Sequence, residues 1–193
     1  MPLPDIRLAT PEDIASLPAI ERAAAALFPE SDLPPTLRQH VTPIGDLRCA
    51  QREGRLWVAV ADDGSVAGFA LASANGPHAC LEEMDVHPDH ARRGFGRALV
   101  SAVADGLRRQ GLQSLNLTTF SHLPWNAPFY ARLGFLPLDE ADLSAELRAA
   151  LAREAALGLR QRIAMRLALQ ASPRVTIAPC HPLRQTPCSA VPR

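Results

Sequence analysis

The 193-residue sequence predicts a single α/β domain in which helices cover both faces of a mixed sheet. Two observations lead to this fold class. Segments with the period of a strand alternate along the chain with segments with the period of a helix. The length suits one domain of about 150–170 residues plus an appendage, and such a domain buries a core without disulfides or metals. We place the domain at residues 1–170 and a tail containing proline and arginine, expected to be disordered, at 171–193.

The sequence of the first half of the domain predicts three strands and two helices. A short strand at Ile6–Leu8 precedes Thr10, a favourable N-cap, and Pro11, which suits a first helical turn. The helix that follows carries apolar residues at Ile14, Leu17, Ile20 and Ala24–Leu27. A proline-rich segment leads to a second short helix at Thr36–Val41. Strands at 56–60 and 66–71 flank Asp62-Asp63-Gly64-Ser65, which predicts a hairpin.

The second half continues the alternation of strands and helices. Gly111 and Gly134 are the expected stops of two of its helices. The predicted elements are a strand at 80–86, a helix at 99–107, a strand at 112–119, a helix at 126–133, a strand at 135–138, a helix at 145–157 and a strand at 163–169.

The charged residues exclude several classes of protein. Twenty basic and 20 acidic side chains cancel, which argues against non-specific attraction to nucleic acid or to an anionic membrane. Every basic residue is arginine, so Schiff-base and P-loop lysine chemistry is excluded. No apolar run approaches the ~18–20 residues of a membrane span, and the N-terminus shows no basic, apolar leader.

The four cysteines predict free thiols and no metal site. Cys49, Cys80, Cys180 and Cys188 lack CxxC spacing. In the tail, Cys180, His181 and Cys188 are of residue types that bind metal ions. Their spacing matches no common metal site.

The segment Leu81–Val100 contains the most specific binding signal. A predicted strand runs through Val86 into a loop with Gly94 and Gly96, where a helix begins. Glycines let the backbone approach a ligand, and the first helical N–H groups and the helix dipole attract an anion. Three arginines add positive charge beside those amides: Arg92, Arg93 and Arg97. The combination suits a pyrophosphate, although Gly-x-Gly alone also fits an ordinary strand-to-helix turn.

A second segment, Leu115–Phe135, strengthens this interpretation. A strand is followed by Asn126, then by Phe129-Tyr130, then by Gly134-Phe135. In this order, about 30 residues apart, the two segments resemble the acetyl-CoA pyrophosphate motif and the downstream motif of the GCN5-related N-acetyltransferase (GNAT) family. The resemblance covers residues 6–169 and implies that family's fold, a single mixed, mostly antiparallel central sheet flanked by helices.

The resemblance implies acetyl-CoA as co-substrate. The residues expected to hold it are Met84, Asp85, Val86, Arg92, Arg93, Gly94, Phe95, Gly96, Arg97, Ala98 and Asn126. One position departs from the family pattern, because Ala91 stands where the family usually has Gln or Arg. Since the family's pyrophosphate contacts come largely from backbone amides, we expect weaker binding rather than none, with Arg92 or Arg93 as substitutes.

The resemblance also implies direct attack of an amine on the thioester. An alkylammonium group has a pKa near ~10.4, so a nearby base is useful, and Glu82 and Glu83 are acids on the appropriate strand. In a regular strand adjacent residues point to opposite faces, so both cannot serve equally. Similarity to polyamine-type acetyltransferases favours Glu82 as the base and Glu83 or Asp85 as the counter-charge. A solvated acidic strand end is the alternative.

Tyr130 occupies the position of the family's general acid, where it would donate a proton or a hydrogen bond to the leaving thiolate. Simple packing is the alternative. The resemblance assigns the developing oxyanion to a backbone N–H of Met84–Val86. Asn126 either bonds the cofactor arm or caps its helix. Trp125 either lines the amine pocket or packs under the loop, and His122 is a rival base.

The predicted function is acetyl-CoA-dependent N-acetylation of a small primary amine in the cytoplasm, with neither nucleic acid nor membrane as partner. A homodimer is left open. One alternative is a non-catalytic acyl-CoA-binding or sensor domain that keeps the cofactor loop. Another is an acetyltransferase for protein N-termini or side chains, which would need a wide groove. The acceptor's identity is not encoded in a readable motif, because segments 25–41 and 121–125 are irregular.

Overall fold

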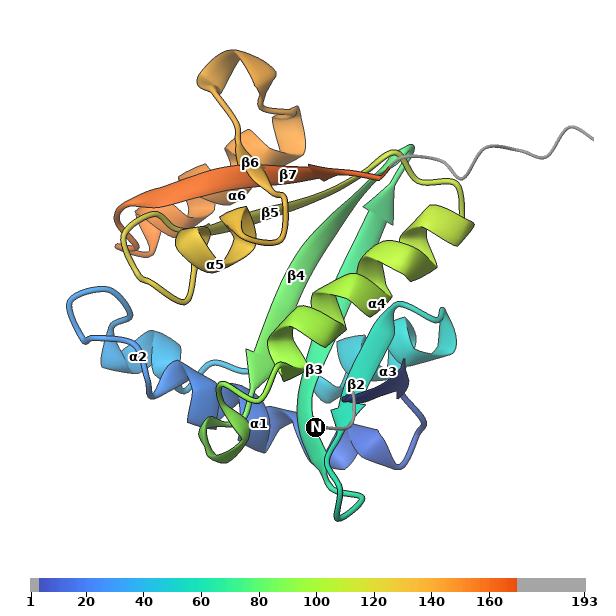
Figure 1. Ribbon diagram of the computed structural model, residues 1–193. Coiled ribbons are helices and arrows are strands. Elements are labelled where there is room, and N and C mark those ends of the chain that lie inside the picture. Colours follow the sequence, from blue (N-terminus) through green and yellow to red (C-terminus); the bar gives the residue numbers. More distant parts are fainter. Residues whose placement is uncertain (1–3, 170–193) are drawn as a thin grey trace, which may run out of the picture.

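The computed structural model describes residues 4–169, and the tail predicted at 171–193, with its cysteines, lies outside them. Seven strands form one sheet in the order β1-β2-β3-β4-β5-β7-β6 (Figure 1). Every neighbouring pair is antiparallel except β4 with β5, which is parallel. The prediction of a mixed, mostly antiparallel sheet is confirmed.

The elements follow the predicted alternation closely. The strands are β1 (Asp5–Leu8), β2 (Leu56–Val60), β3 (Val66–Asn75), β4 (His78–Val86), β5 (Ser114–Phe120), β6 (Leu136–Pro137) and β7 (Arg162–Ala168). The helices are α1 (Leu17–Ala25), α2 (Pro35–Arg38), α3 (Ile44–Arg52), α4 (Phe95–Arg109), α5 (Ala127–Ala131) and α6 (Ala145–Ala156). Short 3₁₀ turns occupy Asp13–Ala15, Pro88–His90 and Glu140–Asp142.

Helices cover both faces of the sheet, as predicted (Figure 1). On one face α4 lies over β2, β3 and β4, and its buried residues share a core with Ala127 and Tyr130 of α5. On the other face α1 and α3 pack around a second core that includes Leu17, Leu47 and Phe69. Helix α6 packs on β5 and β7. No helix among residues 4–169 combines the length and the apolar character needed to cross a bilayer.

Strands β4 and β5 pair over only three residues each, His78–Cys80 with Ser114–Asn116. Beyond these pairs the two strands separate (Figure 1). We call their separated parts, Leu81–Val86 and Leu117–Phe120, the β4–β5 fork. Strand β3 still pairs with this part of β4. The edge of β4 that faces β5 therefore offers backbone N–H and C=O groups without a strand partner.

A β-bulge lies in β4 where the fork begins. Leu71 of β3 pairs with Glu83 and Ala72 pairs with Leu81, so Glu82 has no cross-strand partner. A bulge of this kind interrupts the alternation of side chains along a strand. The expectation that Glu82 and Glu83 lie on opposite faces is therefore wrong.

Both glutamates lie on the face that α1 and α3 cover. Glu83 is opposite Leu71, which belongs to the core under these helices. Glu82 accepts a hydrogen bond from the hydroxyl of Ser73, two residues after Leu71 and thus on the same face of β3. The sheet presents two adjacent acids to one side.

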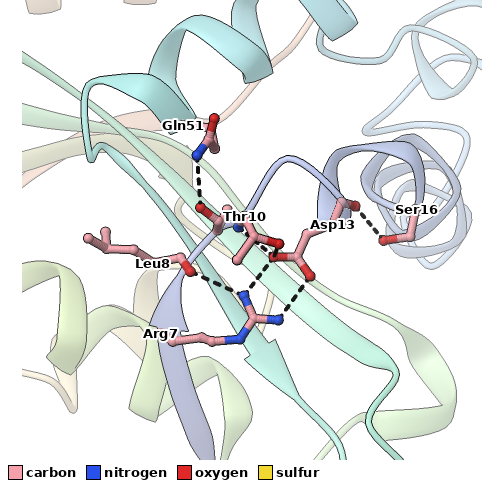
Figure 2. A network of polar contacts seen from close by, with 7 residues as sticks. Arg7, Leu8, Thr10, Asp13, Ser16 and Gln51 are labelled. Carbon is pink, nitrogen blue, oxygen red and sulfur yellow. Dashed lines mark hydrogen bonds and ion pairs between the residues drawn. The ribbon is translucent and has the colours of Figure 1, made fainter.

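The first helix begins later than predicted, because the amide and the side chain of Thr10, the expected N-cap, donate hydrogen bonds to Asp13. The Asp13 carboxylate accepts hydrogen bonds from the Thr10 amide at 2.7 Å and from the Thr10 hydroxyl at 3.1 Å. A 3₁₀ turn follows, and α1 starts after Ser16. Two guanidinium nitrogens of Arg7 reach the same carboxylate at 2.6 and 3.0 Å (Figure 2). This network ties β1 to the start of α1.

Three boundaries differ from prediction for identifiable reasons. Helix α3 was not predicted, because it is short and buries only Leu47 and Ala50. The helix expected at Thr36–Val41 is the single turn Pro35–Arg38. Helix α4 begins at Phe95, four residues before its predicted start, since the loop glycines introduce it directly.

Replacement of Asp13 by alanine is expected to destabilise the protein by about 2 kcal/mol, because Arg7 and Thr10 lose a charged acceptor. Arg7 holds the pKa of Asp13 below its usual value, so this stabilisation is present above about pH 4 and is lost as the pH falls through the lowered pKa. Urea unfolding at pH 7 and pH 3 tests both statements. Asp5→Ala, at an exposed position of β1, is the control. An equal loss at both pH values would contradict the ion pair.

Candidate active site

The loop between β4 and α4 presents backbone amides at the fork. Gly94 occupies the N-cap of α4 with φ +89°, a conformation that side chains rarely adopt. The amide of Ala98 bonds the carbonyl of Gly94 at 3.0 Å, so the amides of Phe95, Gly96 and Arg97 precede the first hydrogen bond of the helix. Free N–H groups at the positive end of a 15-residue helix form a favourable site for an anion.

The side chains of this loop divide into two groups. Arg92, Arg93 and Arg97 are exposed, and Arg92 adopts φ +62°, a strained conformation for a residue with a side chain. The side chains of Phe95, Met84 and Val86 pack into the core on the α4 face. Ala98 is half-buried in the first turn. The core residues can therefore contact a ligand at the fork mainly through their backbone.

A cavity of about 340 Å³ continues from this loop along α4. Its walls come from α4, from the end of α5 and from Leu167 of β7. Three arginines line it, Arg97, Arg108 and Arg132. Arg108 pairs with Asp105, whereas Arg97 and Arg132 form no ion pair within the part of the chain that the structure describes. This cavity suits a second anionic group next to the amides of the loop.

On the opposite face of the sheet three carboxylates lie close together. Glu83 and Asp85 project from β4 toward the α1 side, since their cross-strand partners Leu71 and Phe69 belong to that core. Glu21 of α1 is 8% exposed, and its two carboxylate oxygens each lie 3.0 Å from the amide of Thr42. Glu21 was not predicted from the sequence. The pattern that could have indicated it is an acidic residue four positions after Leu17, on the apolar stripe of the helix.

These carboxylates hold protons to unusually high pH. Burial raises the pKa of Asp85 to about 8, and the charge of Glu21 adds to the shift. Burial also raises the pKa of Glu83 well above its usual value, as do the charges of Asp85, Glu21 and Glu82, while Arg162 opposes them. Burial raises the pKa of Glu21 against the opposing hydrogen bonds from Thr42. Oδ2 of Asp85 is buried and has no hydrogen-bond partner among residues 4–169.

Tyr130 approaches the same carboxylates from the α5 side. Its ring packs against Phe129 and Phe135, with centroids 5.1 and 5.5 Å away, and the residue is 7% exposed. Burial raises the pKa of Tyr130, and the charges of Asp85 and Glu83 raise it further. Because β4 and β5 are separated here, a side chain that packs in the α4-face core can interact with acids on the opposite face.

Asn126 does not cap α5 with its side chain. It occupies the N-cap position with φ −107° and ψ −113°, and its side chain forms no capping hydrogen bond. Its Oδ1 atom is buried without a partner within residues 4–169. The capping alternative for Asn126 is therefore wrong, and an acceptor remains available beside Tyr130.

Two loops meet on the α1 face and form what we call the roof, consisting of Phe28, Asp32, Phe120, His122 and Trp125. The ring of Phe28 lies 5.6 Å from that of Phe120 and 6.2 Å from that of Trp125. Asp32 Oδ1 lies 3.1 Å from His122 Nε2. Trp125 packs edge-on against Phe28 while remaining 46% exposed. His122 is engaged with Asp32, which makes it a poor candidate for a free base.

Arg162 joins the roof to the carboxylates. It stacks over Phe120 at 4.5 Å and forms a two-pronged ion pair with Glu154, at 2.8 and 2.9 Å. Its charge also acts on Glu83 and Tyr130. Because Glu154 already neutralises Arg162, the charge of Arg162 offsets only part of the rise in the pKa of Glu83.

Cys80 lies beside this site but is chemically inert. Burial and the nearby acids Glu82 and Glu154 raise the pKa of its thiol to about 12. Among residues 4–169 no group of three or more His, Cys, Asp or Glu side chains is arranged to hold a metal ion.

Comparison with solved structures identifies the fold. The chain aligns over 90% of its length with the ribosomal-protein-S18-alanine N-acetyltransferase from Escherichia coli, at a TM-score of 0.63 and 21% identity, covering 98% of that chain. It aligns over 88% of its length with N-acetylglutamate synthase from Neisseria gonorrhoeae complexed with coenzyme A and N-acetyl-glutamate, at a TM-score of 0.65 and 18% identity, covering 36% of that chain. The fold is that of an acetyltransferase.

The sequence identifies the family. Residues 17–135 match the model of the acetyltransferase (GNAT) family, and the chain belongs to that family, whose enzymes use acetyl-CoA. It is 38% identical over 88 residues to streptothricin acetyltransferase from Streptomyces lavendulae, covering 43% of this chain and 45% of that protein. It is 29% identical over 100 residues to the ribosomal protein bS18-alanine N-acetyltransferase from Escherichia coli K12, covering 51% and 68%. The chain thus spans less than half the length of the first relative.

Replacement of Gly96 by valine is expected to lower the affinity for acetyl-CoA at least about tenfold. A Cβ atom at Gly96 would lie 3.4 Å from Phe129 Cζ and 3.8 Å from Met84 Cε, so the added side chain would occupy the space between α4 and the fork. Unlike Gly94, Gly96 has no positive φ, so the effect comes from blocked approach and not from loop strain. Calorimetric titration with acetyl-CoA measures it.

Gly45→Val is the matched control for this substitution. Gly45 lies in the first turn of α3, where an added Cβ would meet no atom within 4 Å. Normal affinity in both variants would mean that the cofactor binds elsewhere.

Replacement of Asp85 by asparagine is expected to stabilise the protein at pH 8.5 by at least about 1 kcal/mol. This is a minimum, because a shift of one unit in the pKa of Asp85 already corresponds to about 1.4 kcal/mol. Because the pKa of Asp85 is about 8 in the folded protein, wild-type stability falls as the pH rises from about 4 to 8. The variant lacks this loss, so the difference in melting temperature between variant and wild type grows with pH. Asp62→Asn, in an exposed turn, is the control. A difference independent of pH would show that Asp85 is ionised throughout.

Proposed function

We propose that the protein transfers the acetyl group of acetyl-CoA to a small primary amine that enters from the α1 face of the sheet. The observation that carries this proposal is the meeting of Tyr130, Glu83 and Asp85 at the β4–β5 fork. There the anion-binding loop on one face adjoins a carboxylate cluster on the other. A thioester reaching the fork from the loop would thus face an amine held by the acids.

The loop and the fork supply the groups that coenzyme A requires. The amides of Phe95–Arg97 suit the diphosphate, with Arg92 and Arg93 beside them. The cavity lined by Arg97, Arg108 and Arg132 suits the remaining phosphate. The unpaired edge of β4 offers hydrogen bonds to the amide-containing arm, and the free Oδ1 of Asn126 offers another.

The Glu83–Asp85 pair is a better base than Glu82, which we had favoured from the sequence. Glu82 is exposed and accepts a hydrogen bond from Ser73, whereas the pKa of Tyr130 responds to Asp85 and Glu83. An alkylammonium group has a pKa of about 10.4, and an ordinary aspartate lies more than ~6 units lower. With the pKa of Asp85 at about 8, the gap shrinks to about 2.4 units, or roughly 3 kcal/mol. Burial thus makes deprotonation of the amine feasible.

The transfer then proceeds without a covalent enzyme intermediate. The neutral amine forms a C–N bond to the thioester carbonyl, a backbone N–H of Met84–Val86 stabilises the oxyanion, and the C–S bond breaks. The raised pKa of Tyr130 makes its hydroxyl a weaker acid than the leaving thiol, whose pKa is near ~8.5. Tyr130 therefore stabilises the thiolate by a hydrogen bond. The acceptor nitrogen loses one proton to the carboxylate pair before the attack and a second proton after the C–N bond has formed. One of these two protons reaches the sulfur, and the other leaves to the solvent.

The roof favours a small acceptor over a protein. Its contacts join the segment after α1 to the segment after β5 on the side from which the amine enters. An extended polypeptide would need these loops to separate. A protein acceptor is the rival supported by the bS18-alanine N-acetyltransferase relative, and it requires the Asp32–His122 contact to open.

An amine panel with a thiol-detecting readout tests this function. We expect CoA release with alkylamines and arylalkylamines to exceed release with a peptide that begins with alanine. Tyr130→Phe is expected to lower kcat by roughly 10–10³-fold while leaving the affinity for acetyl-CoA nearly intact. Binding without thiol release from any acceptor would favour the acyl-CoA sensor, and faster turnover of the peptide would favour the protein acetyltransferase.

A further inference from the structure

Glu21 is a buried acid that the transfer mechanism does not use. It projects from the middle of α1, which packs on β4 and β3. The amide and hydroxyl of Thr42 hold its carboxylate, at 3.0 and 3.3 Å. These contacts occupy only part of its capacity to accept hydrogen bonds. A carboxylate kept on the apolar stripe of a helix costs stability, so its place beside Glu83 and Asp85 calls for a compensating ligand.

Two independent observations point to a ligand at this cluster. Tyr130 is 7% exposed, and its hydroxyl has no hydrogen-bond partner among the described residues, although it lies within the field of Asp85 and Glu83. The Oδ2 atom of Asp85 is likewise buried and unpartnered. A buried polar atom normally has a partner, so Oδ2 of Asp85 is arranged for a molecule that donates a hydrogen bond to it beside Tyr130.

Building on the proposed function, we propose that Glu21 is a specificity-determining residue that selects acceptors carrying a second positive charge beside the amine to be acetylated. The amine that attacks must be neutral, and its proton passes to the Glu83–Asp85 pair. Glu83 and Asp85, whose pKa values burial raises, then hold protons, and Glu21 is the acid of the cluster whose charge is left to be compensated.

The described residues supply little compensating charge for Glu21. Arg162, the cation that acts on Glu83, is already held by Glu154. Arg22 and His40 act on Glu21 more weakly than its burial does. A second ammonium group on the acceptor would neutralise Glu21 directly. Its aliphatic part would pass the roof rings Phe28 and Trp125, which are apolar.

The experiment compares 1,5-diaminopentane with 1-aminopentane, two acceptors of equal chain length that differ in one charge. Wild-type kcat/KM is expected to favour the diamine at least about tenfold, the effect of roughly 1.4 kcal/mol. Glu21→Gln keeps the shape of the side chain and is expected to lower this preference about tenfold through the KM for the diamine. Because the charge of Glu21 also raises the pKa of Asp85, kcat is expected to fall to the same extent with both amines, so the ratio of the two kcat/KM values is the readout.

Glu30→Gln removes the same charge from the exposed segment after α1 and should leave the preference unchanged. Glu21→Asp keeps the charge, so its preference for the diamine should lie between those of wild type and Glu21→Gln. If Glu21→Gln does not fold, this intermediate preference confirms the assignment. Equal wild-type turnover of the two amines, or an equal loss of kcat/KM for both in Glu21→Gln, would overturn the proposal. If no amine causes release of the CoA thiol, the proposed function is contradicted independently of the role of Glu21. Calorimetry of 1,5-diaminopentane with the CoA-loaded protein then decides the role of Glu21, because only wild type should bind it tightly.

Discussion

The separation of β4 from β5 is the constraint on which the site depends. A parallel pair that continued past Cys80 would satisfy the backbone of both strands and close the sheet between its two faces. Because pairing stops there, the edge of β4 keeps hydrogen-bonding groups free, and Tyr130 can pack in one core while the charges of acids on the other face act on it. The bulge at Glu82 adds to this effect by turning Glu83 toward α1. The fold thus joins two half-sites that lie on opposite faces of the sheet.

Burial of the acids links the stability of the domain to its chemistry. In water Glu83 and Asp85 would ionise near pH 4 and would be poor bases for an alkylammonium ion. Enclosed between α1, β4 and α5, and close to Glu21, they hold protons until well above that pH. The same desolvation that destabilises the folded state near neutral pH therefore brings the proton affinity of the site closer to that of its substrate. Ion pairs elsewhere, such as Arg7 with Asp13, stabilise the helix that carries Glu21.

The sequence predicted the sheet, the order of its elements and the anion-binding loop, because each depends on local signals. Alternation reveals strands such as β2 and β7, and the pair Gly94 and Gly96 marks the start of α4. The bulge at Glu82 was not predictable, since it arises from the register between β3 and β4 and leaves no mark in the spacing of residues.

The acceptor side was harder to predict for a similar reason. Glu21, Phe28 and Trp125 come from three segments that are distant along the chain, and only the tertiary fold brings them to one face. The sequence left Asn126 as either a contact of the cofactor arm or a helix cap, and only the structure shows that its side chain forms no capping hydrogen bond. Local patterns therefore predicted the proposed donor half of the site, whereas the proposed acceptor half needed three-dimensional information.

The inertness of Cys80 has a consequence for the fate of the acetyl group. A thiol with a pKa of about 12 is ionised in only about one molecule in 10⁴–10⁵ near neutral pH. Thioester exchange requires the thiolate, so this cysteine cannot capture the activated acyl group even though it lies at the root of the fork. The donor is thereby protected from wasteful self-acylation at this position, and its lifetime on the protein is governed by the arrival of an acceptor.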